Sequence, residues 1–129
     1  MTRLDEFVAR RHELAARYDA AFAGLPLVVP HQHRDSFSAY HLYPIRLQLG
    51  AIARNRRQVF EQLRAAGIGV NLHYIPVHTQ PFYRELGFRE GMFPESERYY
   101  AEAITLPLYF GLDYADQDRV IAAVGRALS

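Results

Sequence analysis

Residues 71–86, NLHYIPVHTQPFYREL, hold two histidines, two tyrosines, two prolines and a glutamine, directly after a segment that is predicted to be a strand. A plain connection between two elements needs none of these side chains. Four interpretations are open: a metal site, a catalytic cluster, a binding wall, or aromatic packing around a turn that the prolines stiffen. The elements on either side of this stretch decide the fold class.

The segment before it begins with a predicted helix and two extended pieces. Apolar residues recur at helical spacing over residues 4–22, with Thr2 placed to cap the start. A short extended piece at 25–30 precedes a predicted strand at 38–49. Pro44 in that strand cannot donate a ladder hydrogen bond, so the strand should lie at a sheet edge there or carry a bulge.

A capping box and a glycine stop define the next helix. Asn55 and Gln58 have capping-box spacing, and the predicted helix runs to Ala66. Gly67 supplies the left-handed residue that ends it in a Schellman turn. Residues 69–74, GVNLHY, then predict a further strand with two sides of different polarity.

Three more elements are predicted after the opening stretch. Thr79 can cap a short helical turn, and Pro94 stands where prolines begin helices. Residues 105–112, TLPLYFGL, predict a short strand, and Asp113 caps a final helix. The alternation predicts an α+β fold: a small sheet of three to four strands with about four helices, which we expect on one face.

Length and composition favour a single domain over residues 1–129, since the chain is half apolar and 22% charged. The net charge of +1 gives no strong field, so neither nucleic acid nor a membrane surface is expected as a partner. No apolar run approaches the roughly 20 residues that span a bilayer, and we expect a soluble, cytoplasmic protein. With no cysteine, thiolate metal sites and cysteine nucleophiles are excluded.

The basic residues are fifteen arginines and no lysine. A Schiff base therefore cannot form on a side chain of this polypeptide. Aldol, transamination or decarboxylation chemistry that depends on lysine would need one from another polypeptide. We accordingly expect no catalytic residue and no bound cofactor in this chain.

Most motifs for other chemistry are missing. A metal site would use His73 and His78, but Pro76 separates them and no plain third ligand is nearby, so no metal is expected. The serines lie in no nucleophile-elbow sequence, and the glycines of GIGV end a helix where a phosphate loop would begin one. Packing at the rim of a core remains open beside a binding wall.

Two segments form a specific pattern, GIGVNLHYIPVHTQPFYRELGF (67–88) and FPESERYYAEAITLPLYFGLDYADQDRVI (93–121), and 38–47 and 4–22 extend it in the same order. Over essentially the whole chain this pattern resembles the C-terminal part of the DegT-type sugar aminotransferases, which depend on pyridoxal phosphate and act on nucleotide-linked keto-sugars. The motif HYIPVH is most similar to the sequences of one branch of this family. That branch aminates UDP-linked 4-keto-6-deoxy-N-acetylhexosamines in the synthesis of pseudaminic-acid-type sugars.

The resemblance implies the small C-terminal domain of the aspartate aminotransferase fold, without the large domain that holds the cofactor and its lysine. It implies pyridoxal phosphate for the full-length enzyme only, which would move an amino group from glutamate to the sugar ketone. The isolated chain would be inactive. The residues implied as wall and substrate-facing positions are His73, Tyr74, Pro76, His78, Gln80 and Tyr83, with His41 and Arg46 as weaker candidates.

The implied partners are the missing large domain and a nucleotide-sugar, and a homo-oligomer is expected. Two alternatives to a separated enzyme domain stay open. One is a module that binds a nucleotide-sugar by itself. The other is a module that self-associates through the surface that the large domain would cover, with the first helix as a candidate.

Overall fold

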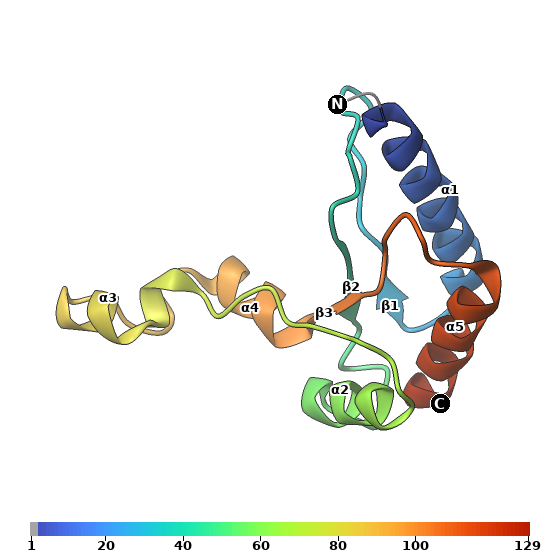
Figure 1. Cartoon of the computed structure of the whole chain (residues 1–129). Helices are drawn as coiled ribbons and strands as arrows, with labels where there is room; N and C mark the ends of the chain where they lie inside the picture. The colour runs from blue at the N-terminus through green and yellow to red at the C-terminus, as the bar shows by residue number, and fades with distance from the viewer. Residues whose placement is uncertain (1–2) are drawn as a thin grey trace.

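The computed structural model describes residues 3–129 and confirms the α+β class (Figure 1). Within these residues the helices are α1 (Leu4–Phe22), α2 (Arg56–Ala65), the 3-10 helix η1 (Val77–Thr79), α3 (Pro81–Glu85), α4 (Pro94–Glu102) and α5 (Tyr114–Leu128). The strands are β1 (Leu27–Val28), β2 (Tyr43–Leu47) and β3 (Ala103–Leu106). The predicted first helix thus has the extent that its apolar spacing indicates.

The three strands form one antiparallel sheet in the order β1-β2-β3. Tyr43, Ile45 and Leu47 alternate to one face and are fully or almost fully buried, because α1 and α5 cover that face (Figure 1). The core continues through the helices, which contribute Leu14, Tyr18, Phe22, Val59, Leu63, Val120 and Val124. Because α1 and α5 cover only one face of the sheet, its other face is open to a different segment of the chain.

The helix ends follow the local chemistry of the sequence. Asn55 and Gln58 form the predicted capping box, and Asp113 accepts the N–H of Asp116 at 2.7 Å. Gly67 has a φ of +78°, and the next residue, Ile68, donates its N–H to the Leu63 carbonyl at 3.0 Å. These contacts confirm the predicted start and stop signals. The predicted cap at Thr2 lies outside the described residues.

Three local predictions are wrong. Residues 69–74 are not a strand: only Asn71 forms a bridge, to Thr105, and Tyr74 is 72% exposed. The last strand is Ala103–Leu106 and not 105–112, because Pro107 ends it. Thr79 does not cap a helix; its hydroxyl bonds the Pro76 carbonyl at 2.7 Å, and α3 begins after Gln80 without a side-chain cap.

Residues 74–102, here called the arm, project from the open side of the sheet (Figure 1). The chain runs outward through η1 to α3 at the tip and returns through α4 directly into β3. Apart from Pro76 and His78, no residue of the arm is buried. The arm is therefore a projection with almost no core of its own.

Within the described residues, no helix combines the length and the apolar character needed to cross a bilayer.

Candidate functional site

The candidate residues fall into three places. His73 and Arg46 lie at the open face of the sheet, five others lie on the arm, and His41 is an exposed residue just before β2. Alternation along the strand predicts His41 on the same side as Tyr43, but the regular strand begins only at Tyr43. The structure therefore groups seven of the eight predicted residues on the arm and at its base.

The open face of the sheet carries a histidine that its neighbour orients. The Nδ1 atom of His73 lies 2.9 Å from the hydroxyl of Thr105, and the ring is half-buried. Thr105 stands opposite Pro44 on β2, so both side chains point to the face that α1 and α5 do not cover. The Nε2 atom of His73 has no hydrogen-bond partner within residues 3–129.

Arg46 lies on the same face and fastens the arm to the sheet. Its Nε and Nη2 atoms both donate to Oε2 of Glu102, at 3.0 and 2.6 Å. The guanidinium also lies 5.8 Å from the centre of the Tyr99 ring. Both partners belong to the last turns of α4, so Arg46 acts first as a brace between arm and sheet.

The five arm candidates divide into exposed and buried side chains. Tyr74 is 72% exposed, Gln80 is exposed, and Tyr83 is 36% exposed. Pro76 and His78 are buried. The first three can meet a ligand or another surface, whereas the last two shape the segment that presents them.

The buried histidine is paired with a carboxylate that the sequence did not single out. The Nε2 atom of His78 lies 2.7 Å from Oε1 of Glu97 on α4, and the ring packs on Phe93 at 4.9 Å between centroids. The hydrogen bond from His78 holds the pKa of Glu97 below its ordinary value of 4.5. The charged carboxylate is thus the form that this contact favours.

Apolar side chains on the arm are exposed in unusual number. Of the fifteen large apolar or aromatic residues exposed among residues 3–129, eight lie in the stretch from Tyr74 to Phe93 inclusive. They include Phe82 at 65% and Leu86 at 62%, both near the tip. Clusters of this kind mark surfaces that another protein surface covers. The first helix, the surface expected to self-associate, exposes only Leu4 among its large apolar residues.

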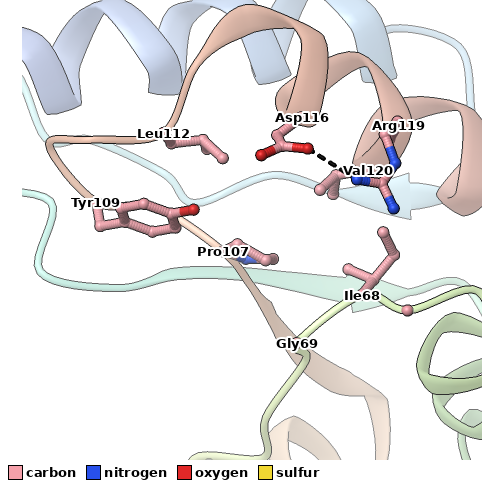
Figure 2. Close-up of a pocket in the computed structure, with 9 residues that line it drawn as sticks. Ile68, Gly69, Pro107, Tyr109, Leu112, Asp116, Arg119 and Val120 are labelled. Carbon is pink, nitrogen blue, oxygen red and sulfur yellow. Dashed lines mark hydrogen bonds and ion pairs between the residues drawn. The ribbon is translucent and has the colours of Figure 1, made fainter.

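One well-formed hollow of the structure lies away from all these residues. A cavity of about 370 Å³ opens between the loop after α2, the loop after β3 and the start of α5 (Figure 2). Buried Ile68, Leu112 and Val120 line it, and the Tyr109 ring and the Asp116–Arg119 ion pair, 2.8 Å long, stand at its side. None of the eight candidates lines this cavity.

Residues 1–125 match the DegT/DnrJ/EryC1/StrS aminotransferase family. The chain belongs to this family. It is 37% identical to the spore coat polysaccharide biosynthesis protein SpsC of Bacillus subtilis over 96% of its own length and 33% of that protein. It is 35% identical to the uncharacterized protein MJ1066 of Methanocaldococcus jannaschii, over 93% of this chain and 32% of that one.

Solved structures of other aminotransferases share the fold. The sugar aminotransferase Spr1654 of Streptococcus pneumoniae, described as putative and in its PMP form, superposes with a TM-score of 0.90 at 31% identity, over 98% of this chain and 32% of that one. DesV of S. venezuelae, in complex with a ketimine intermediate, superposes with a TM-score of 0.88 at 31% identity, over 99% and 34%. PseC of Helicobacter pylori, at 23% identity, has the same fold with a TM-score of 0.88.

The chain spans about a third of the length of these DegT-family relatives. The side chains of this chain do not fit pyridoxal phosphate, because its fifteen basic residues are all arginine and an arginine cannot form the aldimine with the cofactor. Among residues 3–129, moreover, no three histidine or carboxylate side chains gather in a way that could hold a metal ion.

No sequence pattern singled out the residues that support the candidates, which are Thr105, Glu97, Glu102 and Tyr99. Three of them lie on α4, where charged and aromatic residues at helical spacing indicate an ordinary solvated surface. Their partners lie between 19 and 56 residues away in sequence. Only the course of the arm brings each pair together, so no local pattern could have identified them.

Proposed function

We propose that this chain is the small domain, residues 1–129, of a pyridoxal-phosphate-dependent sugar aminotransferase, and that the complete enzyme aminates a nucleotide-linked 4-keto-sugar in amino-sugar biosynthesis for cell-surface polysaccharides. The observation that carries the proposal is the family match over residues 1–125 together with a span of only a third of each relative. SpsC, named for spore coat polysaccharide biosynthesis, supports the class of product. The cofactor and its lysine would belong to the other two thirds, and the chain alone would be inactive.

The arm supports a role as one wall of a cleft. It presents Tyr74, Gln80 and Tyr83 on a segment that also exposes large apolar side chains, among them Phe82 and Leu86. Tyrosine and glutamine donate and accept hydrogen bonds, as the hydroxyls of a sugar require. Apolar neighbours exclude water when the opposite wall closes. The arm would thus meet substrate with its polar groups and the large domain with its apolar ones.

His73 is the candidate best prepared to meet a ligand from the sheet. Thr105 fixes its ring through Nδ1 and leaves Nε2 without a partner among the described residues. Arg46 already binds Glu102, so a direct phosphate contact would have to replace a 2.6 Å ion pair. We therefore assign His73 to the substrate and Arg46 to the support of the arm.

A chimera tests the proposal. The third of SpsC that matches this chain is replaced by residues 1–129, and the product is incubated with pyridoxal phosphate, glutamate and a UDP-linked 4-keto-6-deoxy-N-acetylhexosamine. Mass spectrometry should detect the amino-sugar, whereas neither the chain alone nor truncated SpsC should form it. Internal-aldimine absorbance or product from the chain alone would contradict the proposal, as would a folded, cofactor-loaded chimera that makes no amino-sugar.

Matched tyrosines test the wall within that chimera. Tyr74→Ala should raise KM by about tenfold, as expected for loss of a hydrogen bond and a contact surface worth about 1–2 kcal/mol. Tyr109→Ala removes another exposed tyrosine, which lies beside the cavity and away from the arm, and should leave KM unchanged. Equal effects of the two substitutions would remove Tyr74 from the wall.

The exposed apolar residues of the arm favour a second candidate, a module that self-associates without catalysis. The isolated chain would then pair through Phe82 and Leu86, and light scattering would give a mass near twice that of the monomer. The double substitution Phe82→Ser and Leu86→Ser should return it to a monomer. This candidate would be contradicted if the wild-type chain stays monomeric at high concentration and the double substitution costs the chimera no activity.

A further inference from the structure

His78 is the only buried residue between Val77 and Glu102. It is 7% exposed, and its Nε2 atom lies 2.7 Å from Oε1 of Glu97. Phe93, which immediately precedes α4, packs against its ring. In a segment with so little apolar burial, a buried polar contact carries an unusual share of the local stability.

The same carboxylate holds a third piece of the arm. The N–H of Gly91 donates to both oxygens of Glu97, at 2.8 and 3.0 Å. Gly91 has a φ of +87°, a conformation that favours glycine, so the turn between α3 and α4 is shaped to deliver this N–H. Glu97 thus joins η1, the Gly91 turn and the first turn of α4.

The other charged pairs of the arm do not connect its parts in this way. Arg84 and Glu90 are 53% and 72% exposed, and Arg98 and Glu95 lie within one turn of α4. Exposed pairs of this kind contribute little. Glu97, with a 26% exposed side chain and a 7% exposed partner, is the exception.

We propose that Glu97 is a positioning residue, which holds η1 and the Gly91 turn against α4 and so fixes the place of Gln80 and Tyr83 in the wall. Its carboxylate would act through His78 and would not touch a substrate. The importance of this position for a sugar substrate rests on the proposed function. The contact itself does not, so it can be tested without substrate or cofactor.

Hydrogen–deuterium exchange on the 129-residue chain tests the proposal, with Glu97→Gln compared with Glu95→Gln. Both substitutions remove one charge from the first turns of α4, but Glu95 pairs only with Arg98. Glu97→Gln should speed exchange in peptides from residues 77–93 by about tenfold or more, because local opening becomes easier. Peptides from β2 and β3 should keep their rates, and Glu95→Gln should match the wild type. Unchanged exchange in 77–93, or equal acceleration throughout the chain, would overturn the proposal.

A spectroscopic readout separates positioning through His78 from a general loss of structure. Nitrogen-15 NMR should show the Nε2 resonance of His78 shifted in Glu97→Gln and unchanged in Glu95→Gln. Combining His78→Asn with Glu97→Gln should accelerate exchange in the arm no more than the stronger single substitution. Additive effects would mean that Glu97 acts independently of His78 and would overturn the proposal. A chimera without amination activity would leave these results as they stand.

Discussion

Pro44 of β2 lies opposite Thr105 of β3, and Thr105 exchanges both of its backbone hydrogen bonds with Asn71 on its other side, at 2.8 and 3.1 Å. Thr105 therefore needs no donor from Pro44. The backbone nitrogen of Pro44, which carries no hydrogen, faces away from β3 and toward β1. That strand pairs only with Arg46 and Leu47, so the sheet is open at Pro44. The proline occupies a local edge inside the middle strand, as its chemistry requires.

Pro44 should therefore be replaceable while its neighbour is not. Pro44→Val should change the free energy of unfolding by less than about 1 kcal/mol, since valine suits a strand and no ladder bond is affected. Ile45 pairs with Ile104, and alternation along an antiparallel ladder makes this the hydrogen-bonded pair. Ile45→Pro should cost about 3 kcal/mol or more, from the lost bond and the lost packing. Urea denaturation of both variants measures the difference, and similar losses would show that the local edge is unimportant.

The capping box predicts a second measurable contribution. Asn55 Oδ1 accepts the N–H of Gln58 at 2.9 Å, and Gln58 Oε1 accepts the N–H of Asn55 at 2.9 Å. Asn55→Ala should lower the free energy of unfolding by about 1 kcal/mol, whereas Asn55→Asp should stay within about 0.5 kcal/mol because it keeps the accepting oxygen. Chemical denaturation checks both. An aspartate variant as unstable as the alanine variant would mean that the cap oxygen is not the cause.

Features encoded by neighbouring residues could be predicted from the sequence. Asn55 and Gln58 lie three residues apart, and Ile68 and Leu63 lie five apart, so the spacing alone specifies each contact. The buried alternation of β2 is local in the same sense. The wrong strand at 69–74 has the period of a strand, but only Asn71 finds a partner. An alternating pattern indicates that the two sides of a segment differ in polarity. It does not indicate whether a neighbouring strand is present to pair with the segment.

The short helical turn after Thr79 and the helix that begins at Pro94 could be predicted, but the course of the arm could not, because its residues are not shaped by a core of their own. Helical and strand periods arise from one buried face, and α3 and α4 bury no residue. The density of aromatic residues at 71–86 indicated a segment that the structure places largely on the arm. The difference between Tyr74, which is exposed, and His78, which is buried, depends on Glu97 and Phe93 arriving from a later helix. A single sequence does not show which distant residues are in contact, so this difference in burial could not be predicted from it.

The brace at the base of the arm can be measured as a coupling energy. The side chains of Arg46 and Glu102 are 34% and 22% exposed, and their closest atoms lie 2.6 Å apart. A double-mutant cycle with Arg46→Met and Glu102→Gln should give a coupling of about 1 kcal/mol. The pair Arg57 and Glu61 on α2, 84% and 58% exposed, is the matched control and should give no more than about 0.5 kcal/mol. Equal couplings in the two cycles would mean that Arg46 does not brace the arm.

The buried tyrosines predict a loss of stability in alkali. Burial and the hydrogen bond to Asp19, 2.5 Å long, raise the pKa of Tyr43 well above its ordinary value of 10.0, and burial likewise raises the pKa of Tyr18. Each pKa is higher in the folded state than in the unfolded chain. The stability that these groups contribute is therefore complete below pH 10 and is lost as the pH rises further, by up to about 1.4 kcal/mol per pH unit for each tyrosine.

Tyr43→Phe separates the two contributions of that hydroxyl. At pH 7 the variant should be about 1 kcal/mol less stable, because Asp19 loses its donor. Above pH 10 its free energy of unfolding should fall less steeply than that of the wild type, by about the share of one tyrosine. Tyr109→Phe, at a half-exposed position, should leave the stability at pH 7 unchanged. Guanidinium titrations between pH 7 and 11 give both quantities, and identical alkaline slopes for Tyr43→Phe and the wild type would show that the Tyr43 hydroxyl ionises as easily in the folded chain as in the unfolded one.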